Sequence, residues 1–188
     1  ASWEFGTKRF LFLGSSCIYP KYSEQPIKEE FLLTSKLEET NQWYAIAKIS
    51  GLKLCEAYRN QYNFDTISLM PTNLYGPRDN YDLKNCHVMA ALIRKFYEAK
   101  KNNYDEVICW GTGKPLREFL YVEDFAEACI YLLENWFPNK TLSSSNKNNQ
   151  SINWLNVGSD FEISIKDLAL FIAKSIGYKG KIVCDETK

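Results

Sequence analysis

Short apolar runs alternate with longer amphipathic stretches along the chain. The run Arg9–Leu13 ends at Gly14, which is typical of a buried parallel strand. Between residues 44 and 62, apolar positions recur every third residue, which predicts a helix. The same alternation predicts strands over residues 66–70, 107–110, 152–157 and 180–184, and helices over 88–101, 124–134 and 164–176. Strands and helices that alternate in this way favour an α/β fold with a largely parallel sheet.

Local signals define some of these elements more closely. The helix over 88–101 has one apolar face, made of Val88, Ala91, Leu92, Phe96 and Ala99. Ser164 and Asp167 resemble a capping box at the start of the last helix, and Gly177 is a natural stop at its end. Residues 138–151 are polar and low in complexity, which predicts a flexible surface insertion.

The composition narrows the class of protein. The 188 residues carry 23 basic and 23 acidic side chains, so the formal net charge is zero, which argues against a nucleic-acid binder that works through bulk positive charge. An apolar share of 45% is ample for a packed core. No apolar stretch approaches the ~18 residues of a membrane span, and the first residues lack the pattern of a secretory signal. We therefore expect a globular protein with neither nucleic acid nor membrane as a partner.

Six cysteines are spread over the chain without a Cys-x-x-Cys spacing. They are Cys17, Cys55, Cys86, Cys109, Cys129 and Cys184. Dispersed cysteines of this kind favour reduced thiols over a disulfide framework or a zinc site. The sequence thus predicts a cytoplasmic protein without a metal centre.

A tyrosine and a lysine four residues apart form the first candidate for chemistry. Tyr44 and Lys48 lie in a predicted helix, and their spacing places the phenol and the ammonium on one face. A nearby ammonium lowers the pKa of a phenol, which suits tyrosine to acid–base work near neutrality. The pair alone is also typical of a partly exposed helix. Ser15 supports a catalytic role for the pair, because it follows the strand Arg9–Leu13 at the edge where open α/β sheets place their active sites.

Four motifs occur in a set order along the chain. They are Gly14-Ser15-Ser16-Cys17-Ile18-Tyr19-Pro20, Tyr44-Ala45-Ile46-Ala47-Lys48, Met70-Pro71-Thr72-Asn73-Leu74-Tyr75-Gly76-Pro77 and Arg117-Glu118-Phe119-Leu120-Tyr121-Val122-Glu123-Asp124. With them the chain resembles the extended branch of the short-chain dehydrogenase/reductase family, over essentially its whole length outside residues 138–151. The resemblance implies a Rossmann-like parallel sheet with a smaller substrate-binding domain. Residues 1–75 would be the C-terminal half of the NADP-binding Rossmann domain, and residues 76–188 the substrate-binding region interleaved with returning Rossmann elements.

Two further segments, Pro26-Ile27-Lys28-Glu29 and Trp110–Leu120, narrow the resemblance within that branch. The members that the chain resembles most make GDP-L-fucose from GDP-4-keto-6-deoxy-D-mannose, by 3,5-epimerisation followed by NADPH-dependent reduction at C4. The resemblance implies that Cys17 and His87 move the protons at C3 and C5. A thiol and an imidazole suit this task because both exchange protons near pH 7.

The resemblance also assigns the reduction and the binding contacts. Tyr44 would protonate the C4 alkoxide, Lys48 would hold the nicotinamide ribose, and Ser15 would bond the ketone oxygen. NADP(H) would be contacted by Leu13, Gly14, Ser15, Ser16, Tyr44, Lys48, Pro71, Thr72, Asn73, Leu74 and His87. The GDP-sugar would be contacted by Lys95, Trp110 and Arg117. Extended-branch enzymes are usually homodimers through a helix pair that would include the helix of Tyr44, so a homodimer is expected.

One feature of the family is missing from the chain. The family begins with a strand, a Gly-x-x-Gly-x-x-Gly turn and a helix that hold the cofactor pyrophosphate, and no three of the nine glycines have this spacing. We therefore expect a fragment that lacks the N-terminal part of the nucleotide-binding domain. Two alternatives remain: another nucleotide-sugar enzyme of the branch, such as a 4-epimerase or a 4,6-dehydratase, and a non-catalytic remnant. The dehydratase is disfavoured because its Asp-Glu pair would stand where Ser16 and Cys17 are.

Overall fold

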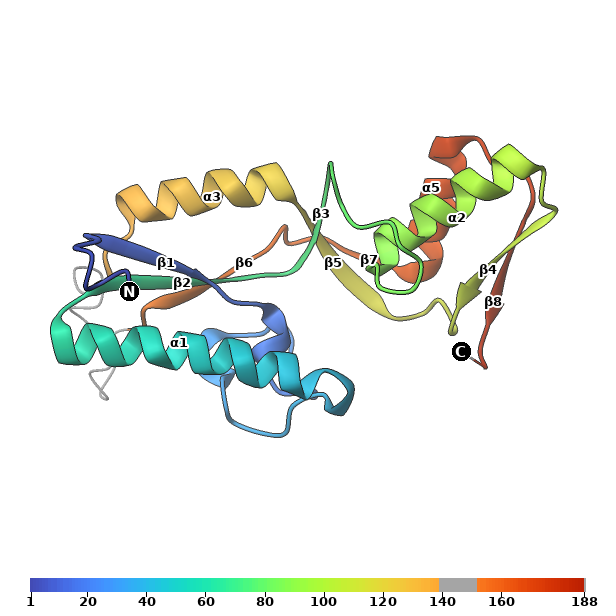
Figure 1. Ribbon diagram of the computed structural model, residues 1–188. Coiled ribbons are helices and arrows are strands. Elements are labelled where there is room, and N and C mark those ends of the chain that lie inside the picture. Colours follow the sequence, from blue (N-terminus) through green and yellow to red (C-terminus); the bar gives the residue numbers. More distant parts are fainter. Residues whose placement is uncertain (139–151, 188) are drawn as a thin grey trace. The chain divides into compact units, whose positions relative to one another are not determined.

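The computed structural model describes residues 1–138 and 152–187 (Figure 1). The insertion predicted over 138–151 lies, apart from Pro138, outside the described residues. The chain forms two compact units: unit 1 comprises Ala1–Thr72 and Glu123–Gly158, and unit 2 comprises Asn73–Val122 and Ser159–Lys188. Each unit has its own strands, helices and core, and each is described by itself.

Unit 1 is built on a three-stranded parallel sheet. Its strands are β1 (Arg9–Leu13), β2 (Asp65–Pro71) and β6 (Trp154–Val157), in the order β1-β2-β6. Leu13 pairs with Leu69, so β1 and β2 end together. The central strand β2 is buried along nearly its whole length, as expected for a parallel strand covered on both faces. The predicted α/β fold with parallel strands is confirmed.

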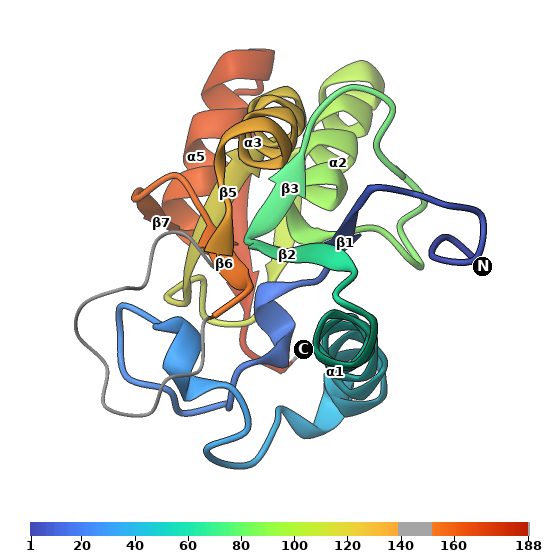
Figure 2. The same cartoon turned by 90° about the vertical axis from the view of Figure 1, so that its left-hand side faces the viewer.

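Helices cover both faces of this sheet, with α1 (Gln42–Tyr62) on one and α3 (Val122–Asn135) on the other (Figure 1, Figure 2). The helix α1 buries three of the apolar residues that recur at every third position, Ile49, Leu52 and Cys55, but it leaves the fourth, Ile46, 44% exposed. Ala45 is buried instead. The end of α3 is fastened to β1 because the Arg9 guanidinium donates hydrogen bonds to the carbonyl oxygens of Leu133, at 2.6 Å, and of Trp136.

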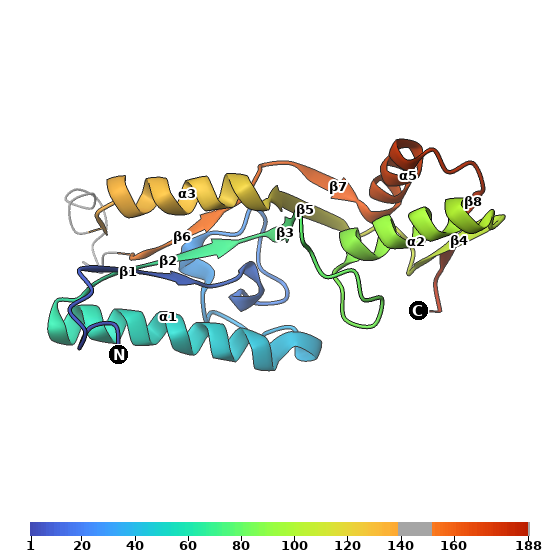
Figure 3. The ribbon, with the colours of Figure 1, turned by 45° about the horizontal axis from the view of Figure 1, so that its top comes forward.

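Unit 2 has its core between two helices and a strand pair. The strands β4 (Glu106–Trp110) and β8 (Lys181–Asp185) run parallel, and α2 (Val88–Asn102) and α5 (Ile165–Ile176) pack on one face of them (Figure 3). Phe96 of α2 lies at the centre of this core and is completely buried. The predicted apolar face of α2 holds with one difference, because Ala90 is buried and Ala91 only partly so.

A second small sheet in unit 2 was not predicted from the sequence. It consists of β3 (Asn73–Tyr75), β5 (Leu116–Tyr121) and β7 (Glu162–Ser164), with β3 parallel and β7 antiparallel to β5. These strands are short and carry charged side chains such as Arg117 and Glu118, so they lack the apolar runs by which the other strands were found. Because β5 and β7 run antiparallel, the strand pairing in the structure is largely, but not entirely, parallel.

The signals at the ends of α5 are confirmed. The Ser164 hydroxyl accepts a hydrogen bond of 3.0 Å from the Asp167 backbone N–H, which satisfies a donor that the first turn leaves open. At the other end Gly177 adopts a left-handed conformation with φ of 75°, which a glycine takes at little cost. Within the described residues, no helix has the length and apolar character needed to cross a membrane.

Candidate active site

Ser15 stands directly beyond the carboxyl end of β1. Its backbone is extended, with φ of −165° and ψ of 147°, and its side chain caps a single 3₁₀ turn over Ser16–Ile18. The cap is a hydrogen bond of 3.2 Å that the Cys17 N–H donates to Ser15 Oγ. This contact uses a lone pair of the hydroxyl and leaves its proton for another acceptor. Ser15 can therefore donate a hydrogen bond to a ligand at this edge of the sheet.

Gly14 lets the end of β1 lie close against β2. Its N–H donates to the Leu69 carbonyl oxygen at 2.8 Å, which continues the ladder one residue beyond β1. A Cβ atom at Gly14 would lie 2.2 Å from the Met70 sulfur, far inside van der Waals contact. A larger residue at position 14 would therefore have to displace the buried end of the Met70 side chain.

The pair on one face of α1 is present as predicted. Lys48 donates a hydrogen bond from Nζ to the Leu13 carbonyl oxygen at 2.9 Å, and Nζ lies 5.6 Å from the centre of the Tyr44 ring. Tyr44 is 46% exposed, so its phenol is open to a ligand. A bond to the last carbonyl of β1 thus fixes the ammonium beside the tyrosine and at the same strand end as Ser15.

Two residues that the sequence analysis missed support this arrangement. A Cβ atom at Gly51, one turn after Lys48, would lie 2.3 Å from Cζ of Phe12, so the glycine makes a notch in which the Phe12 ring lies. Lys48 Nζ is 5.5 Å from the centre of the same ring. A glycine within an amphipathic helix costs about 1 kcal/mol relative to alanine and indicates a packing reason. That signal could have pointed to Gly51, whereas its partner Phe12 could not be identified without the fold.

Cys17 is exposed, although the two residues after it, Ile18 and Tyr19, are buried. All six cysteines are free thiols. Burial raises the pKa of Cys55 and of Cys109, which makes these two thiols poor nucleophiles and proton donors near neutrality. Exposure therefore separates Cys17 from the other five cysteines, which are buried or partly buried.

The residues predicted to contact the cofactor after β2 belong to both units. Pro71, the last residue of β2, and Thr72 end the first segment of unit 1, where the Thr72 N–H donates to the Val157 carbonyl oxygen at 3.2 Å. Asn73 and Leu74 begin unit 2 as part of β3, and the Asn73 side chain donates to the Glu118 carbonyl oxygen at 2.9 Å. The predicted segment is therefore the first of three places where the chain passes from one unit to the other.

In unit 2, the structure brings Lys95 and Trp110 together. Lys95 Nζ donates to the Ile108 carbonyl oxygen at 3.0 Å and lies 4.8 Å from the centre of the Trp110 ring, within the range of a cation–π contact. Both side chains reach solvent, and Trp110 is 61% exposed. Arg117 lies on β5, where its guanidinium donates to the Leu116 carbonyl oxygen at 2.8 Å. His87 is exposed at the N-cap position of α2.

The predicted site residues thus form two groups. Ser15, Cys17, Tyr44 and Lys48 belong to unit 1, and the contacts above bring Ser15, Tyr44 and Lys48 to the carboxyl end of β1. The second group, in unit 2, consists of His87, Lys95, Trp110 and Arg117.

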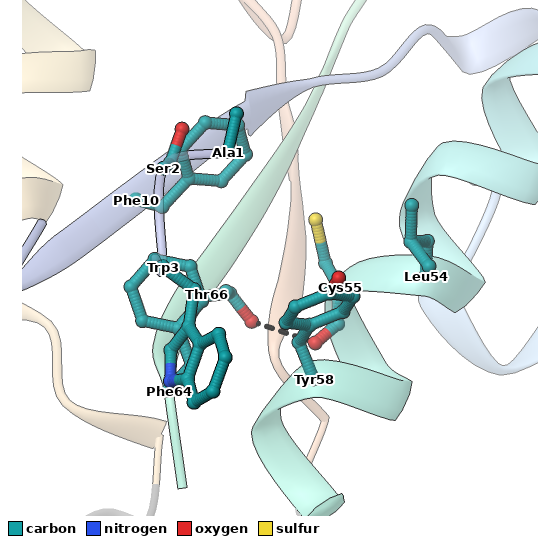
Figure 4. A pocket seen from close by; sticks show the side chains of 9 residues that line it. All are labelled: Ala1, Ser2, Trp3, Phe10, Leu54, Cys55, Tyr58, Phe64 and Thr66. Carbon is teal, nitrogen blue, oxygen red and sulfur yellow. Dashed lines mark hydrogen bonds between the residues drawn. The ribbon is translucent and has the colours of Figure 1, made fainter. Parts of the chain in front are cut away.

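A small hollow of about 150 Å³ in unit 1 is a separate feature (Figure 4). Its lining is mainly apolar and aromatic and includes Trp3, Phe10, Tyr58 and Phe64. Phe10 is near the start of β1, at the opposite end from Ser15. The hollow contains none of the predicted site residues, and its lining suits packing rather than polar chemistry.

Comparison with known proteins defines the class. The sequence pattern of the NAD dependent epimerase/dehydratase family matches residues 1–142. The chain therefore belongs to the NAD dependent epimerase/dehydratase family.

Individual relatives carry more particular names. The chain is 52% identical to the putative GDP-L-fucose synthase 2 of Arabidopsis thaliana, over 100% of this chain and 53% of that protein. It is 47% identical to the GDP-L-fucose synthase of Escherichia coli K12, over 100% of this chain and 57% of that protein. Among solved structures, a GDP-L-fucose synthetase from Naegleria fowleri bound to NADP matches with a TM-score of 0.86 and 30% identity, over 100% of this chain and 56% of that one. The chain spans about half the length of the curated relatives it matches.

Proposed function

We propose that the chain serves GDP-L-fucose synthesis, in which GDP-4-keto-6-deoxy-D-mannose is epimerised at C3 and C5 and then reduced at C4. The observation that carries the proposal is the corner made by Ser15, Tyr44 and Lys48 at the carboxyl end of β1. Identity of about 50% to GDP-L-fucose synthases over the full length of the chain supports it. Unit 1 would carry the cofactor and most of the reduction chemistry, and unit 2 the GDP-sugar.

The residues at this corner fit a nicotinamide nucleotide. An ammonium has three N–H donors, and the contact with Leu13 uses one, so Lys48 has two left for ribose hydroxyls. Further contacts would come from Leu13, Gly14, Ser15, Ser16, Tyr44, Pro71, Thr72, Asn73, Leu74 and His87, and much of that contact would be through the backbone. NADPH, when bound, supplies the hydride that reduces C4.

Ser15 and Tyr44 handle the C4 oxygen during reduction. Ser15 donates a hydrogen bond to the ketone oxygen and so favours the negative charge that develops there. Tyr44 then gives its phenolic proton to the alkoxide. The Lys48 ammonium stabilises the tyrosinate that remains, because Leu13 fixes it beside the ring.

Cys17 and His87 carry out the epimerisation. The hydrogens on C3 and C5 are both α to the C4 ketone, so either can leave as a proton with formation of an enolate. Inversion requires that one group removes the proton from one face of the sugar and another returns a proton to the opposite face. We assign these two roles to the exposed thiol of Cys17 and the exposed imidazole of His87. The hydrogen bond from Ser15 to the C4 oxygen stabilises the enolate as well.

Lys95, Trp110 and Arg117 bind the GDP moiety. The two cationic side chains suit diphosphate oxygens, and the exposed Trp110 ring offers a flat surface beside Lys95. The Ile108 carbonyl holds Lys95 in place before any ligand arrives, which lowers the entropic cost of binding.

Product analysis tests the proposed function directly. The protein expressed from the complete reading frame that contains this chain is incubated with GDP-4-keto-6-deoxy-D-mannose and NADPH. We expect a product heavier by two hydrogens in mass spectrometry, whose NMR couplings identify GDP-L-fucose. A folded protein that yields a reduced sugar with the starting configuration, or no reduced sugar, contradicts the proposal.

Cys17→Ser separates the two halves of the reaction. In deuterated water, this variant should lose incorporation of deuterium at C3 and C5, while hydride transfer from NADPH changes comparatively little. Cys86→Ser is the matched control, because Cys86 is a partly buried thiol next to His87 to which we assign no chemistry. Incorporation at the wild-type rate in Cys17→Ser rules Cys17 out.

We further propose that the enzyme is a homodimer that uses the outer face of α1 and works in the cytoplasm. Apolar side chains on that helix are exposed, with Trp43 at 76% and Leu54 at 58%, and the six free thiols suit a reducing compartment. The dimer predicts that Leu54→Asp halves the mass measured by light scattering. A wild-type protein with the mass of a monomer excludes the dimer.

A further inference from the structure

Three hydrogen bonds join the segment that follows Cys17 to one residue of β6, Asn156. The Tyr19 hydroxyl donates to Asn156 Oδ1 at 2.6 Å, and Asn156 Nδ2 donates to the Ile27 carbonyl oxygen at 3.0 Å. The Asn156 backbone N–H donates to a carboxylate oxygen of Glu29 at 2.9 Å. Three residues of one segment, up to ten positions apart in the sequence, therefore meet on one asparagine.

The chemistry of this cluster requires the residue types that are present. A carboxamide has an acceptor and a donor on one planar group, so Asn156 can receive the Tyr19 proton and donate to Ile27 at the same time. Tyr19 is only 4% exposed, and burial together with the nearby Glu29 carboxylate raises the pKa of its phenol. The phenol therefore keeps its proton and remains a hydrogen-bond donor. All members lie in unit 1, and a lost partner would leave a buried polar group unsatisfied.

This cluster lies two residues after the exposed thiol of Cys17. On the side before the thiol, the chain is fixed by the bond from the Gly14 N–H to the Leu69 carbonyl. On the side after it, the chain is fixed by the buried side chains of Ile18 and Tyr19. The 3₁₀ turn that carries Cys17 is thus held between β2 on one side and β6 on the other.

We propose that Asn156, Tyr19 and Glu29 are positioning residues that fix the Cys17 thiol for proton transfer at C3 and C5. The inference rests on the proposed function and adds the residues on which its epimerisation half depends. It also explains the segment Pro26–Glu29, whose Ile27 carbonyl and Glu29 carboxylate both bond Asn156. Tyr44 and Lys48 lie on α1 and make none of these bonds, and of the three reduction residues only Ser15 touches the turn, so we expect reduction to depend on the cluster less than epimerisation does.

The test compares the two half-reactions in Tyr19→Phe, with the protein from the complete reading frame. A misplacement near 1 Å costs on the order of a hundredfold in rate, so we expect deuterium incorporation at C3 and C5 to fall by about tenfold to a hundredfold. Hydride transfer from NADPH should fall by less than about threefold, since the bonds that hold Gly14 to Leu69 and Lys48 to Leu13 do not involve the Tyr19 hydroxyl. Ser23→Ala is the matched control, because it removes a hydrogen bond from the same segment that does not involve Asn156.

Glu29 gives a second pair of variants with little change in fold. Glu29→Gln retains an oxygen that can accept from the Asn156 N–H and should keep wild-type incorporation, whereas Glu29→Ala should lower it. Equal losses of incorporation and hydride transfer in Tyr19→Phe and Glu29→Ala would show a general structural role and overturn the proposal. So would unchanged incorporation in both variants.

A readout without substrate distinguishes failure of this inference from failure of the proposed function. Iodoacetamide labels exposed Cys17, and peptide mass spectrometry gives its rate. Tyr19→Phe and Glu29→Ala should change that rate several-fold, and should also speed amide hydrogen exchange over residues 17–29, while Ser23→Ala changes neither. If these shifts occur but the wild-type protein turns over no GDP-sugar, the cluster positions Cys17 and the proposed function is wrong. If the protein is active and the shifts do not occur, the positioning role is wrong.

Discussion

Each of the two units holds a helical lysine on a backbone carbonyl of a neighbouring parallel strand and beside an aromatic ring. In unit 1, Lys48 of α1 bonds the Leu13 carbonyl at 2.9 Å and lies 5.6 Å from the Tyr44 ring. In unit 2, Lys95 of α2 bonds the Ile108 carbonyl at 3.0 Å and lies 4.8 Å from the Trp110 ring. The two arrangements share these two contacts, although Tyr44 lies on the same helix as its lysine and Trp110 lies on the strand.

They differ in the ring and in the place along the strand. Tyr44 has an exchangeable phenolic proton and Trp110 has none that titrates, so only the first pair can transfer a proton. Leu13 is the last residue of β1, two positions before Ser15, whereas Ile108 lies two residues before the end of β4. The comparison teaches that the same way of fixing an ammonium can be combined with a side chain that donates a proton or with one that only offers a flat surface.

The largest change in rate is expected when the Tyr44 ring of unit 1 loses its hydroxyl. Tyr44→Phe keeps the ring and removes the proton, so the rate of NADPH oxidation at saturating substrate should fall by ~10²–10⁴-fold, the usual contribution of a general acid. Deuterium incorporation at C3 and C5 should be affected far less. A rate of NADPH oxidation within threefold of wild type would show that Tyr44 is not the proton donor.

Replacing each of the two lysines by methionine, one at a time, should sharpen the comparison between the units. Lys48→Met should lower kcat for reduction by about tenfold to a hundredfold, because the ammonium stabilises charge that appears on the tyrosine during the reaction. Lys95→Met should instead raise KM for the GDP-sugar by about tenfold and leave kcat nearly unchanged, as loss of uniform binding does. Steady-state kinetics distinguish the two patterns. The same pattern in both variants would remove the functional distinction between the units.

Gly51→Ala tests the packing beneath Lys48. Helix propensity alone predicts a gain of about 1 kcal/mol in the free energy of unfolding. We expect instead a loss of about 1–3 kcal/mol, because the new methyl group meets the Phe12 ring. Urea unfolding measures the difference, with Ser50→Ala on the exposed side of α1 as the control. The double variant Phe12→Leu with Gly51→Ala should recover part of the loss, and a stabilised single variant would contradict the notch.

The smallest change in kinetics is expected when the Trp110 ring of unit 2 is replaced. Trp110→Leu removes a cation–π contact worth about 0.5–1 kcal/mol at an exposed site, so KM for the GDP-sugar should rise by about two- to fivefold. Trp110→Phe keeps an aromatic face and should show a smaller rise. Unchanged KM in both variants would exclude the ring from substrate binding.

The sequence predicted the parts of the fold that depend on local pattern. Three predictions rested on neighbouring residues, and the structure contains the predicted element in each case: the apolar run of β1, the helical spacing of apolar residues in α1, and the cap of α5. Tyr44 and Lys48 were paired correctly because four residues make one helical turn. The carboxyl end of β1 was identified because a glycine follows an apolar run.

What the sequence did not reveal depends on partners far along the chain. The strand β5 (Leu116–Tyr121) is short and mixed in polarity, and it becomes a strand because β3 and β7 pair with it. Tyr19 and Asn156 are 137 positions apart, so no local pattern shows their bond. The same holds for Phe12, whose fit against Gly51 exists only once α1 lies on β1.

The acceptors that fix Lys48 and Lys95 are main-chain oxygens, and this affects how the protein can change over time. A side chain that holds a lysine can be lost by a single substitution, but the carbonyls of Leu13 and Ile108 are present whatever residue stands there. Either strand can therefore accept new side chains without releasing its ammonium, as long as the backbone keeps its path. The aromatic residues beside the lysines can then be substituted while the lysines stay in place. The fold could therefore acquire new chemistry beside either lysine and keep the backbone contacts that orient the ammonium.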